Sequence, residues 1–365
     1  MNVCILTVAW PPRCGGSGFY AFELADALAK KGHRVTVYTN QSENSKAGGI
    51  NIIKVKSRSP HLLFYNLNLR KLEKQTVSKK FDVVLHNEVA GVMLSKHFFS
   101  TQTNVMALHH QTDKEYSLTF SRKLRLKLVQ ILQDRMVRLA DAVSFLADQA
   151  RQQAINRYGL TKPTFLVPCI VTLPEKKKVN SIKNKRPVIY YPSGAGNNYE
   201  RKGFVEFIPV ISDLVKAGLE FDVVVSGGSD HIIQILRAKV ADAHLNNVDF
   251  TQNLSFKEVM RLYDRADIVA FTSRYEGFGR PIIEGISHGK PVVTFDVGIA
   301  DEVIDTGLNG YVVASHDDAK LAIKQLLEDS TLRTRIGNHA SKTDLSQFSE
   351  SAIVTAFVQM VEELS

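Results

Sequence analysis

The 365-residue sequence has little cysteine and no long hydrophobic run. Its three cysteines, Cys4, Cys14 and Cys169, are scattered and odd in number, which indicates a reducing compartment and argues against a disulfide framework or a zinc site. No stretch reaches the ~18 consecutive apolar residues of a membrane-spanning helix. The first ten residues, MNVCILTVAW, lack a basic segment and a cleavage site, so they predict a buried strand and not a signal peptide. These absences favour a cytoplasmic protein.

The composition that is present fits a globular chain of two domains. Hydrophobic residues make up 44% and charged residues 23% of a chain that is too long for one compact core. The charge is uneven, because residues 1–180 contain 27 Lys and Arg against 12 Asp and Glu, while the remainder contains 19 against 25. The first half is therefore expected to face a nucleic acid or an acidic membrane, unless its basic surface is simply solvated.

Short apolar segments alternate with amphipathic ones along the whole chain. Nearly continuous apolar strands separated by helices form parallel sheets that are covered on both faces, so the alternation predicts an α/β fold with two doubly wound, Rossmann-like domains. The expected strands are Val3–Val8, Arg34–Thr39, Ile50–Val55, Asp82–His86, Asn104–His109, Ala142–Phe145, Thr164–Val167, Val188–Tyr191, Asp222–Ser226, Val248–Phe250, Ile268–Phe271, Pro291–Phe295 and Gly310–Val313. Helical patterns include Gly18–Lys31, Ser121–Arg138 and Ser349–Leu364.

A polar, basic stretch bracketed by prolines, Leu173–Pro187, predicts a linker. It separates an N-terminal domain over residues 1–172 from a C-terminal domain over residues 188–347. The last helix, over residues 348–365, is expected to cross back to the N-terminal domain. Since parallel sheets bind ligands at the carboxyl ends of their strands, the ligand is expected in the crevice between the two sheets.

The first strand is followed by a glycine-rich loop, Trp10–Gly18. Glycines let a backbone approach a phosphate or a sugar, and a helix N-terminus favours anions. The spacing Gly16-x-Gly18-x-x-Ala21 formally matches a dinucleotide fingerprint, but the loop holds two prolines and the second strand ends in YTNQ, without an acidic residue. NAD binding is therefore disfavoured, and the loop either contacts another ligand or only caps its helix.

The strongest signal is the segment Ser273–Gly289, SRYEGFGRPIIEGISHG, in which seven residues separate Glu276 from Glu284. Pro281 suits the start of a helix and Gly289 its end. We expect Glu276 on a loop and Glu284 on the first helical turn, where the N–H groups of residues 278–282 are available to a ligand. One carboxylate can accept two hydroxyls, as in the binding of a ribose or sugar ring. The alternative is that Glu284 is only a favourable charge near the helix start, contributing about 0.3–1 kcal/mol.

This segment resembles the glutamate-x7-glutamate motif of family 4 glycosyltransferases, which are retaining enzymes with the two-domain GT-B fold. Other segments similar to that family are Tyr263–Asp267, Gly289–Val293, Gly298–Glu302 and Gly307–Gly310. The resemblance covers essentially the whole chain. It implies transfer of a hexose-type sugar from a UDP- or GDP-sugar to an acceptor.

The resemblance also implies a role for each matching residue. Glu284 would hold the donor ribose, Glu276 would contact the donor sugar, and Lys202 would bind the diphosphate. His109, at the end of a strand, would lie near the donor sugar, with His110 as an alternative. The other expected donor contacts are Gly16, Arg201, Gly277, Phe278, Gly279, Arg280 and Gly298. Glu276, His109 and Lys202 are the expected catalytic residues.

The family usually carries a further arginine upstream of the lysine, where this chain has Gly196 or Asn197. The sequence leaves open whether Arg201 replaces it. Fixed cations and N–H groups near a departing diphosphate stabilise its charge. Because no Asp-x-Asp triplet is present to hold a divalent ion beside a diphosphate, no metal or other cofactor is expected. The resemblance implies retention, by front-face attack.

The segment Ser121–Arg138 contains six basic residues, with Leu124, Leu128, Ile131, Leu132 and Val137 expected on one side. Such a helix either lies on an anionic membrane or packs its apolar side on the sheet with its charges in water. The first arrangement suits a lipid-linked acceptor, such as a glycolipid or a cell-surface polysaccharide intermediate, and a peripheral position at the membrane. No stacking or recognition-helix motif supports a nucleic-acid partner.

Two alternative functions remain open at this point. One is another GT-B reaction, such as epimerisation of a nucleotide sugar, which would need no acceptor. The other is a non-catalytic partner subunit that binds nucleotide sugar, for which a broken glutamate pair or a missing lysine would be expected. Glu276, Glu284 and Lys202 are all present.

Overall fold

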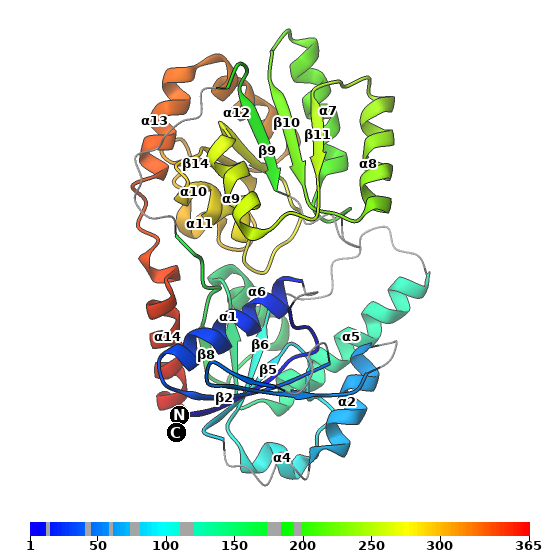
Figure 1. Cartoon of the computed structure of the whole chain (residues 1–365), viewed down its shortest axis with the longest axis vertical. Coiled ribbons are helices and arrows are strands. Elements are labelled where there is room, and N and C mark those ends of the chain that lie inside the picture. The colour runs from blue at the N-terminus through cyan, green and yellow to red at the C-terminus, as the bar shows by residue number, and fades with distance from the viewer. Residues whose placement is uncertain are drawn as a thin grey trace. The chain divides into compact units, whose positions relative to one another are not determined.

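The computed structural model describes residues 1–11, 15–40, 45–57, 61–73, 81–109, 120–173, 184–192 and 199–365, without the side chains of residues 45–47, 61 and 120–125. The chain forms two compact units (Figure 1). Unit 1 comprises Met1–Ile170 and Ser346–Ser365, and unit 2 comprises Val171–Leu345. Each unit has its own sheet with helices, so the predicted fold of two parallel-sheet α/β domains is confirmed.

Unit 1 has an eight-stranded sheet in the order β3-β4-β2-β1-β5-β6-β7-β8. Its strands are β1 Asn2–Leu6, β2 Arg34–Thr39, β3 Ser45–Ala47, β4 Ile50–Lys54, β5 Val83–Asn87, β6 Asn104–Leu108, β7 Ala142–Phe145 and β8 Thr164–Leu166. All neighbours are parallel except β3, an edge strand that pairs antiparallel with β4 and that the sequence did not predict. Strand order reverses at β1, between β2 and β5, so the ligand crevice of this sheet is expected beyond β1 and β5.

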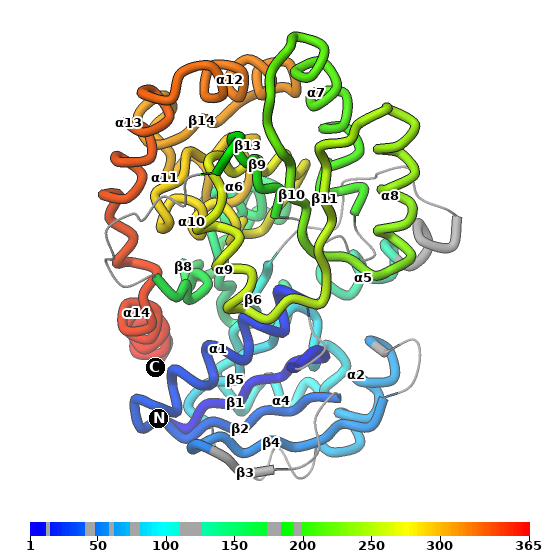
Figure 2. Tube along the Cα trace, turned by 45° about the horizontal axis from the view of Figure 1, so that its top comes forward, coloured from blue at the N-terminus to red at the C-terminus, as the bar shows by residue number. Residues whose placement is uncertain are grey.

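The helices of unit 1 are α1 Gly16–Lys30, α2 His61–Lys71, α4 Lys96–Thr101, α5 Phe120–Leu139, α6 Asp148–Tyr158 and α14 Glu350–Glu363, with the short 3-10 helix Ser346–Phe348. Side chains of α2, α4, α5 and α6 share one buried cluster, so these four helices cover the same face of the sheet. Helix α14 packs on α1, and Lys30 Nζ lies 3.2 Å from Glu350 Oε2. Both views place the chain ends close together in this unit (Figures 1 and 2).

The sequence predicted that the apolar residues of α5 share one side of the helix, but they do not. Leu132 and Val137 are buried, whereas Leu128 and Ile131 are exposed. The expectation that these four residues lie on one side of the helix was therefore wrong. The side of α5 that packs in the buried cluster of unit 1 contains Leu132, Met136 and Val137.

Unit 2 has a six-stranded parallel sheet in the order β11-β10-β9-β12-β13-β14. Its strands are β9 Val188–Pro192, β10 Asp222–Ser226, β11 Val248–Thr251, β12 Ile268–Phe271, β13 Val292–Phe295 and β14 Gly310–Val313. Its helices are α7 Phe204–Lys216, α8 Asp230–Asp242, α9 Phe256–Arg265, α10 Arg280–Ser287, α11 Ala300–Val303, α12 His316–Glu328 and α13 Ser330–Ala340. The chain builds outward from β9 to β11 and returns to place β12 beside β9, which makes the β9/β12 junction the switch point.

Candidate functional site

Three predicted residues meet at the switch point of unit 2. Arg201 and Lys202 lie between β9 and α7, and Glu276 lies between β12 and α10. The Glu276 Oε1 atom lies 2.7 Å from Lys202 Nζ and 2.9 Å from Arg201 Nη1. It also accepts a hydrogen bond of 2.7 Å from Ser273 Oγ. One carboxylate thus draws two cations to the carboxyl edge of the sheet.

The ionisation of Glu276 is set by these neighbours. Burial alone would raise the pKa of this carboxyl, whose side chain is 11% exposed. The Lys202 ammonium and the Arg201 guanidinium outweigh burial and lower the pKa of Glu276 to about 2. Glu276 is therefore a firmly ionised carboxylate across the neutral pH range.

The backbone between β9 and α7 is fixed against the end of β12. Tyr191 Oη donates to the carbonyl of Lys202 at 2.6 Å, and the Arg274 amide donates to the carbonyl of Arg201 at 2.9 Å. Gly203 has a φ of +77°, and a Cβ there would meet the Thr272 carbonyl oxygen. This close approach requires glycine directly after the two cations.

Glu284 has its own set of partners. Its Oε2 atom accepts a hydrogen bond of 2.7 Å from Tyr263 Oη, and its Oε1 atom lies 3.7 Å from Arg280 Nε. Burial and the Glu284 carboxylate raise the pKa of Tyr263 well above its ordinary value, so the phenol stays protonated and donates. The predicted position of Glu284 on the first helical turn was wrong, because α10 begins at Arg280 and Glu284 is its fifth residue.

The expectation of available N–H groups at the start of α10 is also corrected in part. The Ile282 amide donates to the Gly279 carbonyl at 2.9 Å, and Pro281 has no N–H. Gly279 is the N-cap in a left-handed conformation, with a φ of 86°. The Ile282 N–H is therefore used within the glycine cap of the helix and is not available to a ligand.

Gly298 packs closely against the backbone of Phe278. With a φ of +59°, it sits so near Phe278 that a Cβ would meet the Phe278 carbonyl oxygen and lie 2.6 Å from its carbon. The next two amides, of Ile299 and Ala300, donate to the carbonyls of Phe278 and Val297. These two N–H groups thus hold the glycine-rich turn in place, so the donor contact expected at Gly298 does not come from them.

A pocket of about 340 Å³ adjoins Glu284. Its lining residues come from the ends of β9 and β10, the loop after β11, and helices α9 and α10: Tyr190, Pro192, Ser226, Gly227, Gly228, Asn253, Leu254, Val259, Tyr263, Pro281 and Glu284. Sequence reasoning missed the residues contributed by β10, the β11 loop and α9. The signal was present in part, because Gly227 and Gly228 come directly after the predicted strand Asp222–Ser226, and Asn253 lies three residues beyond the predicted strand Val248–Phe250. All three have positive φ.

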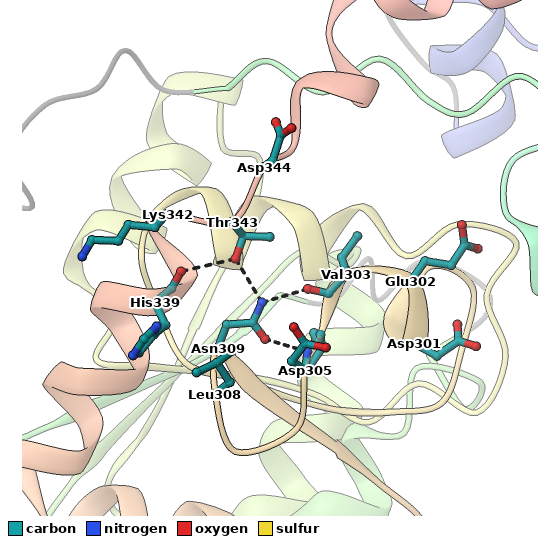
Figure 3. Close-up of a pocket in the computed structure, with 11 residues that line it drawn as sticks. Asp301, Glu302, Val303, Asp305, Leu308, Asn309, His339, Lys342, Thr343 and Asp344 are labelled. Carbon is teal, nitrogen blue, oxygen red and sulfur yellow. Dashed lines mark hydrogen bonds between the residues drawn. The ribbon is translucent and has the colours of Figure 1, made fainter.

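A second pocket of unit 2, of about 360 Å³, lies around α11 and the end of α13 (Figure 3). Asn309 organises it, because its Nδ2 donates to the Val303 carbonyl and to Thr343 Oγ1, while its Oδ1 accepts from the Asp305 amide. None of the predicted site residues lines this pocket. Of these two pockets, the one at Glu284 is the one that a predicted site residue lines.

In unit 1, His109 follows β6 at the carboxyl edge of the sheet and is buried. Its Nε2 atom lies 2.5 Å from Asn87 Oδ1, and its ring packs edge-on against Tyr20 with 4.7 Å between ring centroids. Asn87 Nδ2 in turn donates to Thr7 Oγ1 and to the Ser17 carbonyl, both at 2.9 Å. This amide connects the ends of β1, β5 and β6 with the start of α1, and sequence reasoning did not identify it.

Gly16 is the first residue of α1, and a Cβ there would meet no heavy atom within 4 Å. No close packing therefore requires glycine at this position, and the donor role of Gly16 stays a prediction. Cys14, His110, Gly196, Asn197 and residues 174–183 of the expected linker lie outside the described residues. So do the side chains of Arg122, Lys123, Leu124 and Arg125 on α5.

Across the described ranges, no group of three or more His, Cys, Asp or Glu side chains could hold a metal ion. Among the same residues, no helix has the length and apolar character needed to cross a membrane.

Two family models match consecutive parts of the chain. "Glycosyltransferase Family 4" matches residues 14–173, and "Glycosyl transferases group 1" matches residues 173–343. Together with the two parallel-sheet domains, these matches define a glycosyltransferase of the GT-B type. The chain belongs to glycosyltransferase family 4.

Individual relatives are distant. An alpha-D-kanosaminyltransferase of Streptomyces kanamyceticus is 25% identical over 46% of this chain and 43% of its own length. The chain spans about half the length of the first curated relatives that it matches. Among solved structures, a sucrose-phosphate synthase of Thermosynechococcus elongatus superimposes with a TM-score of 0.84 at 17% identity, over 100% of this chain and 99% of that one. Anabaena Alr3699/HepE in complex with UDP-glucose gives a TM-score of 0.74 at 18% identity, over 100% of both chains. These likenesses show the fold.

Proposed function

We propose that this protein transfers a hexose-type sugar from a UDP- or GDP-sugar to an acceptor, with retention at the anomeric carbon and without a metal. The observation that carries the proposal is the contact of Glu276 with Lys202 and Arg201 at the switch point of unit 2. Such an edge suits a ligand that combines an anionic diphosphate with a neutral, hydroxyl-rich sugar.

In the proposed donor complex, Glu284 accepts the ribose hydroxyls in the 340 Å³ pocket. Glu276 and the backbone of Phe278 and Gly279 receive the sugar, and Lys202 and Arg201 bind the diphosphate. A likeness in fold to a protein whose complex contains UDP-glucose supports a nucleotide sugar as the ligand.

In the proposed reaction, the bond between the anomeric carbon and the diphosphate oxygen breaks, and its electron pair leaves with the diphosphate. The acceptor hydroxyl bonds to the same face of the sugar and its proton passes to the departing oxygen. Lys202 and Arg201 stabilise the growing negative charge, which is usually the largest contribution to such catalysis. Glu276, held by two cations with its pKa at about 2, is suited to orient the sugar and is a weak nucleophile.

We also propose that the acceptor is a glycolipid or a cell-surface polysaccharide intermediate, handled by unit 1 at the cytoplasmic face of a membrane. The basic character of residues 1–180 supports this choice. His109, held by Asn87, is the proposed contributor of unit 1 to catalysis.

A panel of UDP- and GDP-sugars tests the proposal, scored by thermal shift and by release of nucleotide. We expect one class of donor to stabilise the protein, and Glu284→Ala to abolish the shift while the variant remains folded. The matched control is Glu220→Ala, because Glu220 is an exposed carboxylate of unit 2 whose side chain is 74% exposed. Unchanged donor affinity in Glu284→Ala would contradict the ribose assignment.

The same panel separates the two alternatives. A nucleotide sugar whose sugar changes configuration without an acceptor would identify an epimerase. Binding without hydrolysis or transfer, across all donors and a set of lipid and sugar acceptors, would identify a non-catalytic subunit.

A further inference from the structure

The pocket at Glu284 extends along the sheet of unit 2, from the switch point toward the edge strand. Besides Glu284, its lining includes Ser226 at the end of β10 and Asn253 beyond the end of β11. The strand order β12-β9-β10-β11 places Ser226 one strand and Asn253 two strands beyond the β9/β12 junction, where Arg201 and Lys202 lie. A nucleotide with its diphosphate on these two cations and its ribose on Glu284 therefore has its base at the ends of β10 and β11.

The base end of the pocket is neutral. The hydroxyl oxygens of Tyr190 and Ser226 lie 2.6 Å apart, and burial raises the pKa of Tyr190, so its hydroxyl stays uncharged. The carboxamide of Asn253 and the apolar side chains of Leu254 and Val259 complete this end. Among the described residues that line the pocket, Glu284 is the only carboxylate, and the proposed donor complex uses it for the ribose.

The acidic residues that are close to this end in sequence do not line the pocket and have partners of their own. Glu258 caps α9, because its Oε2 atom accepts from the Ser255 amide at 2.7 Å and from the Ser255 hydroxyl at 2.6 Å. The bond from this hydroxyl lowers the pKa of Glu258. Asp230, the first residue of α8, accepts a hydrogen bond from Gln252 Nε2. Neither carboxylate is placed to receive a base.

Asn253 is the residue at this end that can pair with the edge of a base. Its φ is 54°, a left-handed conformation that asparagine adopts more readily than most residues. The side chain is exposed, and no hydrogen bond to another described residue engages its carboxamide. One carboxamide offers a donor and an acceptor side by side.

The hydrogen-bonding edges of uracil and guanine differ in what they require here. Uracil presents its N3–H between two carbonyls, so a carboxamide matches the N–H and one carbonyl, and a hydroxyl can donate to the other. Guanine presents two adjacent donors, N1–H and an amino group, which a carboxylate matches with its two acceptor oxygens. The carboxamide oxygen of Asn253 can receive one of these donors. The second would have no carboxylate to receive it.

We infer that the donor is a uridine nucleotide sugar, with the uracil edge on the carboxamide of Asn253 and the uracil ring against Leu254 and Val259. This inference rests on the proposed function, which leaves the base open between uracil and guanine. It assigns to Asn253 the role of distinguishing the two bases.

The test is calorimetric titration of the full chain with UDP and with GDP. The native chain should bind UDP about 5–150-fold more tightly, because an unpaired buried donor costs about 1–3 kcal/mol and 1.36 kcal/mol is ten-fold. 3-Methyl-UDP, in which a methyl group replaces the N3 proton, should bind at least about ten-fold more weakly than UDP, because it leaves the carboxamide oxygen unpaired.

Asn253→Asp reverses the chemistry at one position. Aspartate also adopts the left-handed conformation, and its carboxylate only accepts hydrogen bonds. We expect the ratio of UDP to GDP affinity to fall at least about ten-fold. This ratio cancels the repulsion between the new charge and either diphosphate. Asn253→Gly keeps the left-handed backbone without the carboxamide, so it should bind UDP and 3-methyl-UDP equally.

The matched control is Asn338→Asp, which adds the same charge at an exposed asparagine of α13 outside the pocket. It should leave the ratio of UDP to GDP affinity unchanged. Thermal unfolding of each variant shows whether it has folded.

Two results would overturn the inference and leave the proposed function standing. One is equal or tighter binding of GDP by the native chain. The other is an unchanged ratio of UDP to GDP affinity in folded Asn253→Asp. Binding of neither nucleotide by the native chain would contradict the proposed donor site itself, and this inference with it.

Discussion

Replacing Tyr263 with phenylalanine tests whether Glu284 is positioned by the tyrosine hydroxyl to receive a ribose. Tyr263 is fully buried and its Oη donates to Glu284 Oε2 at 2.7 Å. A buried hydrogen bond to a charged acceptor contributes about 1.5–3 kcal/mol. If this orientation is used in donor binding, Tyr263→Phe should weaken donor affinity by about 10–150-fold, at 1.36 kcal/mol for each factor of ten.

The assay compares the dissociation constants of the nucleoside diphosphate and of its 2′-deoxy and 3′-deoxy analogues. The native protein should prefer the ribose form, and the variant should lose much of that preference because the carboxylate is no longer held. Tyr65→Phe is the control, since Tyr65 Oη donates to the Tyr38 carbonyl in the core of unit 1. That change should lower the stability of unit 1 by roughly 0.5–1.5 kcal/mol without altering the ribose preference. A Tyr263→Phe variant that binds more weakly but keeps the native ratio of ribose to deoxyribose affinity would refute the reasoning.

Two further predictions concern the same edge of unit 2. The pKa of Glu276 lies at about 2 in the folded protein, below its ordinary value of 4.5, so its stabilising contribution is complete above pH 4.5 and is lost as pH falls toward 2. The size is about 3 kcal/mol, from the difference between a pKa of 4.5 and one of about 2. The free energy of unfolding, measured in urea between pH 5 and 2.5, should fall more steeply with falling pH for the native chain than for Glu276→Gln, and parallel curves would contradict this. Gly298→Ala should destabilise unit 2 by roughly 2–4 kcal/mol, because overpacking adds to the cost of a left-handed alanine. Gly218→Ala, with a φ of +82° and open space around it, should cost only about 1 kcal/mol; equal losses in the two variants would show that contact with Phe278 does not matter.

The strands could be predicted from the sequence because buried parallel strands have continuous apolar segments. β2, β7, β10, β12 and β14 begin and end at the predicted residues. The exception is β3, whose sequence Ser-Lys-Ala has no apolar run, and which pairs with β4 at the sheet edge. Local pattern carries no information about such an edge pairing, because it depends on the neighbouring strand.

The sequence could predict several residues of the site, but not the hydrogen bonds that connect them to their neighbours. The spacing identified Glu276 and Glu284, yet the Tyr263 hydroxyl reaches Glu284 only because the fold brings the end of α9 to α10. Similarly, nothing in the sequence marked Asn87 as a site residue. It contacts Thr7 and His109 because β1, β5 and β6 end together. Long-range contacts of this kind are set by topology, which the local sequence pattern does not contain.

The position of α14 has a consequence for how this chain is made. Ile353, Val354, Phe357, Met360 and Val361 of α14 are buried within unit 1, although the helix is translated after all of unit 2. During synthesis, domains generally fold as units from the N-terminus. The flank of α1 that α14 covers therefore stays uncovered until α14 has been synthesised, so the folding of unit 1 is completed only after the whole of unit 2 has been translated.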